Sequence, residues 1–281
     1  MKYEVHKMKF EYKYLVPCKL LPELRTLISP FMERDGMMNF GGPEGYTVRS
    51  IYFDTPRYDF YHEKEDGLKI RKKLRIRGYN AYNPENFLFL EIKRKNAKKL
   101  MKNRAAVIYK NLNDLLFTGN TGKYVLTDKG LKEPLENAGR FLFNLHKSLL
   151  QPVVLVIYER EAFFGKFDSS MRITFDKYLR SSIDPELNEL FKEENIKYTA
   201  PGSFVLEVKF YDIFPSWMKK IIYSLSLLLF FSSCKQQQVD LIVTNATIYT
   251  VNDAFSKAEA FAIKDGKFVD VGSTSDITTK Y

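Results

Sequence analysis

Apolar and charged residues alternate at the two-residue period of a β-strand through most of residues 8–217. In residues 68–77 (LKIRKKLRIR) every second residue is basic, and the positions between them are apolar except for Lys72. The same pattern predicts further strands over residues 9–16, 46–54, 87–95, 153–163, 171–176 and 204–210. Periodic apolar residues bounded by proline or glycine instead predict helices over residues 22–32 and within residues 112–150.

Most of these predicted strands have one apolar and one ionic face, and two architectures accommodate that pattern. The sheet can keep its charges in water, or it can close into a barrel with the charges inside. Cations on one strand face lie roughly 7 Å apart, so neighbours repel by about 2 kcal/mol at an effective dielectric near 20. An enclosed cationic face therefore needs carboxylates or a polyanion. Arginine dominates several of these faces and suits bidentate phosphate binding in partly dry sites, which favours the enclosed arrangement.

Composition narrows the range of partners and compartments. The 281 residues are 15% aromatic and carry a net charge of +10, nearly all of it in residues 1–217. This balance favours nucleic acid, anionic membrane or phosphate-rich substrates. Cys18 and Cys234 are too few for a disulfide framework, and no cysteine and histidine residues have zinc-site spacing. The N-terminus has no apolar export segment, so we expect a cytoplasmic protein.

Eight short motifs occur in an order that resembles a known family. They are FEYKYLVP, TVRSIYFDTPRYDFYHEKEDG, KLRIRGY, FLEIKRK, KNRAAV, YEREAF, MRITFD and VLEVKF, over about residues 8–217. In this order they resemble the VTC domain, the catalytic domain of polyphosphate polymerases in the triphosphate tunnel metalloenzyme (CYTH-like) superfamily. The resemblance implies an α+β fold: an antiparallel eight-stranded β-barrel tunnel with a charged interior and peripheral helices.

The resemblance also implies an activity and its partners. In such enzymes the γ-phosphoryl group of ATP passes to a polyphosphate chain, with Mn²⁺ or Mg²⁺ bound by a glutamate. The chemistry requires positioning and charge stabilisation more than a covalent nucleophile. The resemblance leaves room for a membrane-protein partner that receives the product, and for a place at the membrane face.

Matching motif by motif, the resemblance implies which residues form the site. Lys69 and Lys73 lie on the same predicted strand face as Arg75 and Arg77 and are left as general lining. The residues expected to contact the transferred group are Arg75, Arg77, Lys93, Arg160 and Arg172. Those expected to bind the rest of the substrate are Lys13, Lys102, Arg104 and Lys209. The expected metal ligands are Glu207 and, less directly, Glu11.

The chain departs from the family pattern at Met218. Residues 218–234 (MKKIIYSLSLLLFFSSC) resemble a bacterial lipoprotein signal, and residues 235–281 resemble the N-terminal β-region of amidohydrolases. We therefore predict a C-terminally truncated tunnel domain over residues 1–217, joined near Met218 to unrelated sequence as a chimera. The apolar stretch 221–231 is shorter than the roughly 20 residues that span a bilayer, so we predict a helix packed on the barrel.

Three functions remain open at the level of sequence. The first is the polyphosphate polymerase, and the second is a triphosphatase or nucleoside triphosphate hydrolase of the same superfamily. The third is a non-catalytic polyanion-binding module. Nucleic-acid binding is disfavoured, because it would require the basic face outside, with aromatics such as Tyr52, Tyr58, Tyr61 and Tyr79 exposed beside it.

Overall fold

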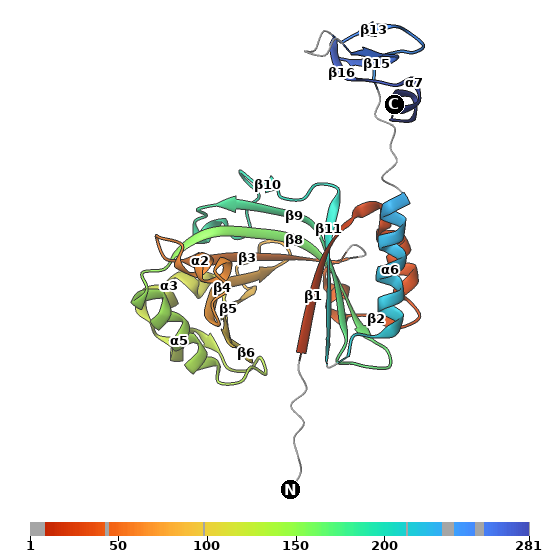
Figure 1. Ribbon diagram of the computed structural model, residues 1–281. Coiled ribbons are helices and arrows are strands. Elements are labelled where there is room, and N and C mark those ends of the chain that lie inside the picture. The colour runs from red at the N-terminus through yellow and green to blue at the C-terminus, as the bar shows by residue number, and fades with distance from the viewer. Residues whose placement is uncertain are drawn as a thin grey trace. The chain divides into compact units, whose positions relative to one another are not determined.

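The computed structural model describes residues 9–42, 45–97, 99–211, 213–231, 239–250 and 256–280. The chain divides into two compact units, Met1–Pro215 and Ser216–Tyr281. The first unit contains all the strands that carry the predicted site, so the fold is described mainly for that unit (Figure 1).

The first unit is built on one antiparallel sheet of eleven strands. Nine of them follow the order β1-β11-β9-β8-β3-β4-β5-β6-β7, while β10 pairs with β9 and β2 with β8 off this path. Eight strands have nine or more residues: β1 (Lys9–Pro17), β3 (Tyr46–Asp54), β4 (Ile70–Tyr79), β5 (Phe87–Asn96), β6 (Lys99–Ile108), β8 (Gln151–Gly165), β9 (Arg172–Ile183) and β11 (Ser203–Tyr211). Three short strands are added at the margins: β2 (Met32–Arg34), β7 (Val125–Leu126) and β10 (Lys197–Tyr198). The strands predicted from alternation are thus present.

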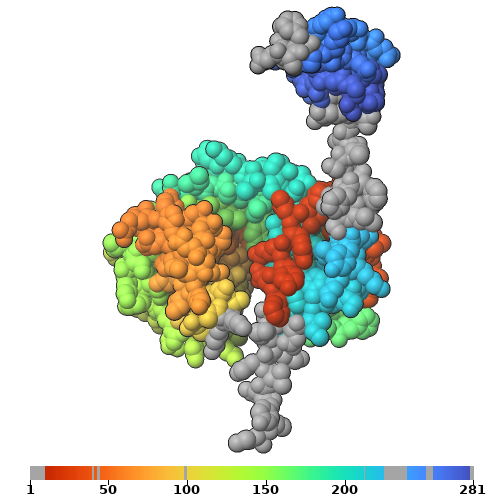
Figure 2. All heavy atoms as spheres, in the orientation of Figure 1, coloured from red at the N-terminus to blue at the C-terminus, as the bar shows by residue number. Residues whose placement is uncertain are grey.

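The sheet curls so that its two ends approach each other. Lys93 of β5 interacts electrostatically with Glu11 of β1 and Lys209 of β11, although these strands are far apart in the strand order. Lys13 of β1 likewise acts on Lys73 of β4. Figure 1 shows β1 standing opposite β5 and β6, and Figure 2 shows a hollow between β1 and the region around β4. We call the concave side of the sheet the inner face.

The expectation of a closed eight-stranded barrel is wrong in two respects. The sheet has eleven strands, and among the described residues no backbone pairing joins β1 to β6. One reason is that β7 already occupies part of the free edge of β6, at Ala106 and Val107. We call the unpaired boundary between β1 and β6 the seam.

Helices cover the outer face of the sheet, which is where the apolar half of each alternating strand points. The α-helices are α1 (Leu21–Ile28), α2 (Asp59–Glu65), α3 (Leu112–Thr118), α4 (Thr121–Tyr124) and α5 (Pro134–Lys147). Single turns of 3₁₀ helix are η1 (Cys18–Leu20), η2 (Gly36–Phe40), η3 (Tyr109–Asn111) and η4 (Leu187–Glu189). Leu74 and Ile76 of β4 and Leu88 of β5 are fully buried in one cluster with Phe141 of α5. Burial of this apolar face fixes the ionic residues of the same strands on the inner face.

Lys72, which breaks the alternation of β4, also has a partner on the outer face. Its Nζ donates to Oδ1 of Asn144 on α5 at 2.7 Å and lies 5.1 Å from the centre of the Phe60 ring. A lysine is therefore accommodated there by an amide, an aromatic ring and the nearby carboxylate of Glu63.

The second unit begins with α6 (Ser216–Phe231). The rest of it contains β12 (Leu241–Val243), β13 (Ile248–Tyr249), β14 (Lys257–Ala258), β15 (Ala260–Lys264), β16 (Lys267–Gly272) and α7 (Thr274–Lys280). Among the described residues, none of the helices has the length and apolar character needed to cross a bilayer. Helix α6 runs through the junction predicted near Met218, and Cys234 lies outside the described residues. The domain boundaries and the chimeric origin stay predictions.

Candidate functional site

The basic residues of β4 lie on the inner face because Leu74 and Ile76 point outward into the core. Arg75 and Arg77 are only 6% and 7% exposed. Backbone pairing sets Arg75 between Tyr52 of β3 and Glu91 of β5. Guanidinium groups buried to this degree need anions or oxygen acceptors around them.

Glu91 is the central anion of this half of the inner face, and its side chain is fully buried. Its Oε2 accepts a hydrogen bond from Arg75 Nε at 2.7 Å, while Lys102 Nζ and Arg104 Nε lie 2.7 and 2.9 Å from its Oε1. Burial alone would raise the pKa of Glu91, but Arg75, Arg77 and Lys102 lower it well below its usual range. Three basic side chains thus share one ionised carboxylate.

A second ionic group lies on β1 and β11. The register sets Glu11 opposite Lys209 and Lys13 opposite Glu207, so that charges alternate in sign. Lys13 Nζ lies 3.2 Å from Glu11 and 3.1 Å from Glu207, and Lys209 pairs with Glu207. Glu207 is 4% exposed, and although burial opposes ionisation, Lys209 and Lys13 lower its pKa to about 2.

Two further arginines extend the ionic lining onto β8 and β9. Arg160 donates from Nε and Nη2 to the two carboxylate oxygens of Asp176, each at 2.7 Å, in a bidentate pair. Arg172 Nη2 donates to Oδ2 of Asp35 at 3.0 Å. Burial raises the pKa of Tyr46, while Arg160 and Arg172 both oppose that rise, so one phenol senses both guanidinium groups.

Hydroxyl groups hold the two buried arginines of β4 without neutralising them. Tyr52 Oη accepts from Arg75 Nη1 at 2.8 Å, and Arg77 donates to Ser50 Oγ at 3.0 Å and to Tyr158 Oη at 3.3 Å. Burial would raise the pKa of Tyr52, but Arg75 and Arg77 lower it below its usual value. These contacts orient the guanidinium groups and leave their positive charge available to a ligand.

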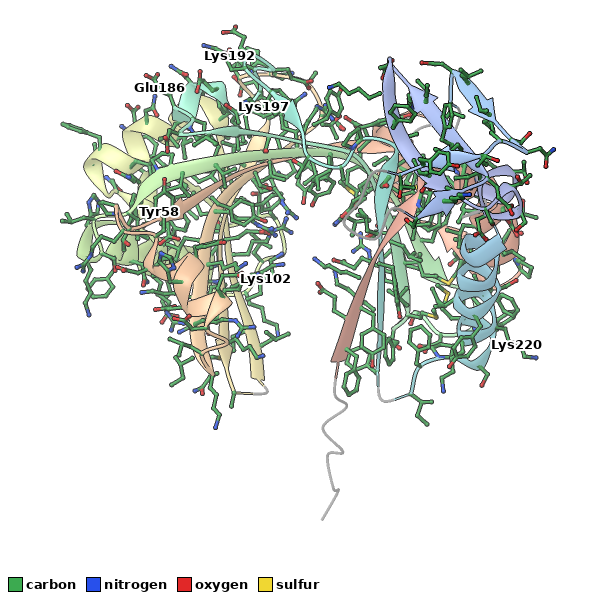
Figure 3. All side chains as sticks on the ribbon, turned by 45° about the horizontal axis from the view of Figure 1, so that its top comes forward. Tyr58, Lys102, Glu186, Lys192, Lys197 and Lys220 are labelled. Atoms are coloured by element: carbon green, nitrogen blue, oxygen red, sulfur yellow. The ribbon has the colours of Figure 1, made fainter. Side chains whose placement is uncertain are left out.

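Two lysines of the site have strongly lowered pKa values. Desolvation, followed by repulsion from Arg75 and Arg77, lowers the pKa of Lys93 to about 7, although its side chain remains accessible to solvent. Desolvation also lowers the pKa of Lys102 to about 8, and its pairing with Glu91 only partly offsets this. Figure 3 shows Lys102 at the margin of β6, beside the space that the curled sheet surrounds. Desolvation, together with the crowding of cations, therefore brings the pKa values of both lysines close to neutral pH.

The structure brings the sequence-predicted residues together on one inner face. Arg172 lies at its margin, bound to Asp35 of a loop and with its side chain 31% exposed. The other predicted site residues on this face are Glu11, Lys13, Arg75, Arg77, Lys93, Lys102, Arg104, Arg160, Glu207 and Lys209. The roles of all these residues in binding and catalysis stay predictions.

Sequence reasoning did not identify the partners that orient the arginines, namely Tyr52, Tyr158 and Glu91. It also left Lys73 as general lining, although Lys73 pairs in register with Lys93. Alternation does place Glu91 and Tyr158 on ionic strand faces, beside Lys93 and Arg160. Only the register between strands, which no single strand contains, shows which cation each of them holds.

A divalent cation fits this site only in company with phosphate. Among the described residues, no three histidine, cysteine, aspartate or glutamate side chains form a cluster. Glu11 and Glu207 supply two carboxylates, both already bonded to Lys13. Mg²⁺ and similar ions are commonly held by one or two carboxylates together with substrate phosphates and water. The donor set therefore suits an ion that arrives with a phosphate ligand.

Two solved structures are similar to this chain at low sequence identity. A Vibrio parahaemolyticus protein proposed to be an adenylate cyclase is 13% identical, with a TM-score of 0.37 over 79% of this chain and 87% of its own. A Hippeastrum protein, proposed to be an adenylyl cyclase and described as having a dominant triphosphatase activity, is 10% identical. Its TM-score is 0.36, over 80% of this chain and 87% of its own. Likenesses this distant carry no argument about the site.

The match to a family model is extensive. The VTC domain model matches residues 8–230, which include every strand of the inner face and continue beyond residue 217, where the sequence predicts the domain to end. With well over half of its residues matched, the chain belongs to the VTC domain family.

Proposed function

We propose that this chain is a phosphoryl transferase of the polyphosphate-polymerase type, which moves the γ-phosphoryl group of ATP onto a polyphosphate chain at the inner face. The excess of cations on that face is the observation that carries the proposal. Of the side chains described above, the acidic ones are Glu11, Asp35, Glu91, Asp176 and Glu207, and the basic ones are Lys13, Lys73, Arg75, Arg77, Lys93, Lys102, Arg104, Arg160, Arg172 and Lys209. A chain of phosphates supplies the missing negative charge along its whole length.

The reaction needs little covalent chemistry from the protein. The bond between the γ-phosphorus and its bridging oxygen breaks, a bond to the terminal oxygen of the polyphosphate forms, and ADP leaves. Catalysis of this kind relies on alignment and on stabilising charge at the equatorial oxygens. Arg75, Arg77 and Arg160 are assigned to the transferred group, because each is held rigidly by protein oxygens. Their fixed geometry limits the reorganisation needed in the transition state.

Glu207, with Glu11 beside it, would hold Mn²⁺ or Mg²⁺ together with the substrate phosphates. When bound, such an ion neutralises charge on phosphate oxygens. Lys13 and Lys209, released from these carboxylates, would then bind phosphates of the polymer. The alternating ion pairs of Glu11, Lys13, Glu207 and Lys209 on β1 and β11 therefore represent the site before substrate binds.

The proposal is tested by incubating the full-length chain with ATP and Mn²⁺, and then measuring ADP release and polymer length by gel electrophoresis. We expect polymer in the parent protein, and a decrease of about 10- to 100-fold in Arg77→Met, since a hydrogen bond to a charged group contributes about 1.5–3 kcal/mol. Arg140→Met is the matched control, because Arg140 lies on α5 and pairs there with Glu136.

Two results would contradict the proposal. Release of free phosphate without polymer would assign the site to triphosphate hydrolysis, and equal activity in the parent and Arg77→Met would remove the inner face from the reaction. Duplex DNA is a useful competitor, because a concave basic face should admit tripolyphosphate but exclude a duplex. A membrane-protein partner for the product stays a prediction from the family resemblance.

A further inference from the structure

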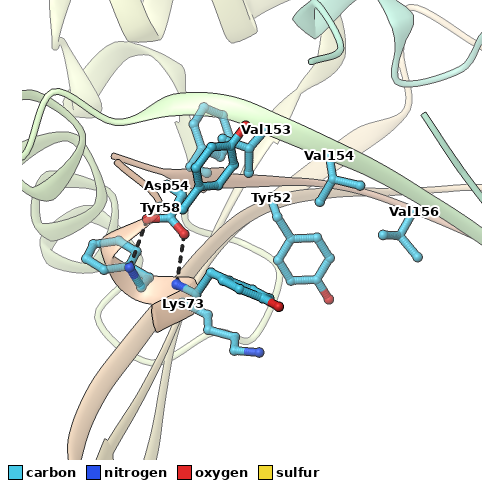
Figure 4. A pocket seen from close by; sticks show the side chains of 10 residues that line it. Tyr52, Asp54, Tyr58, Lys73, Val153, Val154 and Val156 are labelled. Carbon is cyan, nitrogen blue, oxygen red and sulfur yellow. Dashed lines mark hydrogen bonds between the residues drawn. The ribbon is translucent and has the colours of Figure 1, made fainter. Parts of the chain in front are cut away.

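One part of the inner face is apolar and aromatic rather than ionic. A pocket of about 400 Å³ opens there, which we call the Tyr52 pocket. Figure 4 shows Tyr52, Lys73, Val154 and Val156 around it. Its wall includes Tyr52, Tyr58, Tyr61, Lys73, Val154 and Val156, together with Asp54, whose carboxylate is bonded to backbone N–H groups. The two valines are half-buried, and the Tyr58 and Tyr61 side chains are 41% and 56% exposed, so the wall can be reached by a ligand.

The Tyr52 pocket adjoins the cations assigned to phosphate. Lys73 borders the pocket and lies two residues before Arg75 on the same face of β4, opposite Lys93 of β5. Among the described residues Lys73 forms no ion pair, so its ammonium group is available at the boundary. Tyr52 joins the two regions directly, since its ring lines the pocket while its hydroxyl accepts from Arg75.

A phosphate chain has no apolar surface and gains nothing from valine and tyrosine walls. A planar base does gain, because aromatic side chains stack on any nucleobase and burial of its faces removes apolar area from water. The ligand that uses both regions is therefore a base joined covalently to a phosphate chain.

We propose that the Tyr52 pocket binds the base of a nucleoside triphosphate whose phosphates lie on Lys73, Lys93 and Arg75. This inference rests on the proposed function and adds to it a nucleoside subsite separate from the phosphate contacts. The site thereby distinguishes a nucleotide from an inorganic triphosphate, and the base determines which end of the nucleotide faces the arginines.

The test compares ATP and tripolyphosphate by calorimetric titration into the full-length chain at one Mn²⁺ concentration. Two variants alter the pocket in different ways: Tyr61→Ala removes an exposed wall on α2, and Val154→Trp fills the pocket. Tyr198→Ala on β10 is the matched control, as another exposed tyrosine outside the pocket. We expect each pocket variant to weaken ATP binding about tenfold, which corresponds to the loss of one stacking contact. The affinity for tripolyphosphate should change by less than about twofold.

Each outcome decides the matter. Selective loss of ATP affinity in either correctly folded pocket variant supports the subsite. If both ligands bind the parent and the variants change neither affinity, or weaken both equally, the subsite is overturned while the phosphate site stands. If neither ligand binds the parent protein, the proposed function and the subsite fall together.

Discussion

Lys93 shows how the crowding of charge changes the chemistry of a single residue. Its pKa of about 7 lies far below the ordinary lysine value of 10.5, because desolvation and the neighbouring Arg75 and Arg77 disfavour its ammonium form. The folded state therefore binds fewer protons than the unfolded state between about pH 7 and 10. Deprotonation of Lys93 therefore makes the stability of the unliganded protein rise with pH across that range. Below about pH 7, where Lys93 is protonated in both states, this gain in stability is absent.

This lowered pKa predicts proton uptake when a polyanion binds. Phosphate beside Lys93 favours its ammonium form, so at pH 8 binding of tripolyphosphate should draw protons from the buffer, and Lys93 should oppose tight binding as pH rises. Titration calorimetry in buffers of different ionisation enthalpy measures the uptake. Lys93→Arg is the control, because arginine stays charged throughout. Uptake of the same size in that variant would exclude Lys93 as its source.

Among the residues of the inner face, Glu91 should contribute most to the stability of the protein when no ligand is bound. Glu91→Gln leaves Arg75, Lys102 and Arg104 without their shared anion, and removing one partner of a buried ion pair typically destabilises a fold by about 3–5 kcal/mol. Tripolyphosphate should restore stability in the variant more than it stabilises the parent. Thermal unfolding with and without the ligand checks both expectations.

The matched control for Glu91→Gln is Glu136→Gln on α5. Glu136 also pairs with an arginine, but its side chain is 54% exposed, so its removal should change stability by less than about 1 kcal/mol. Equal stabilisation of the parent and Glu91→Gln by tripolyphosphate would show that the ligand does not take over the role of this carboxylate.

At the scale of elements, helix α2 depends on a residue in the strand before it. Asp54, at the end of β3, accepts from the backbone N–H groups of Thr55, Phe60 and Tyr61 at 2.8–3.0 Å, and it is 5% exposed. No side chain at the N-cap position of α2 performs this task. Asp54 thus positions the helix so that Tyr58 and Tyr61 border the Tyr52 pocket.

Asp54→Asn should therefore destabilise the protein by about 1–2 kcal/mol, because an amide cannot accept from all three N–H groups. Urea unfolding measures the loss, and hydrogen exchange should quicken at Phe60 and Tyr61. Asp59→Asn, in the first turn of the same helix, serves as the control and should change stability by less than about 1 kcal/mol. Unchanged exchange at Tyr61 would contradict the role given to Asp54.

Most of the strands could be predicted from alternation, and the exceptions have physical causes. The range predicted for β3 coincides with Tyr46–Asp54, whereas β9 was predicted to end at Asp176 and continues to Ile183. The pattern fails after Asp176 because Lys177 is fully buried on the outer face, 2.6 Å from Glu161, and Tyr178 has a φ of 51°. A buried lysine can be placed only when its carboxylate partner from another strand is known.

The site could be predicted in its residue types but not in its pairing. Alternation alone places Arg75 and Glu91 on ionic faces, and the family resemblance adds the expectation that these faces line one enclosure. Which carboxylate holds which cation depends on the register of β4, β5 and β6, and the absence of pairing across the seam depends on the curvature of the whole sheet. Both are collective properties that local sequence does not contain.

At the scale of the whole molecule, the seam has lysines on both of its sides. Lys13 and Lys209 lie on one side, and Lys93 and Lys102 lie on the other. Across the seam, Glu11 favours the ammonium form of Lys93, and Lys209 disfavours it to a smaller extent. A polyanion attracts both groups at once, so its binding should bring β1 and β6 closer together.

Spin labels at Tyr12→Cys on β1 and Leu100→Cys on β6, in a chain with Cys18→Ser and Cys234→Ser, would measure this movement. We expect tripolyphosphate to shorten and narrow the distance distribution between them. A second pair, Ile70→Cys and Leu100→Cys, stays on the continuously paired side of the sheet and should not change. An unaltered distribution across the seam at saturating ligand would contradict closure by the anion.

The unpaired seam also bears on how a long polymer could enter. Among the described residues no backbone hydrogen bond joins β1 to β6, so the two edges can part without disrupting the ladder on either side. A polymer can enter a closed barrel only by one of its free ends. A curled sheet with an unpaired seam allows polyphosphate, the proposed substrate, to enter from the side as well, so the length of the polyphosphate sets no topological limit on its binding or release.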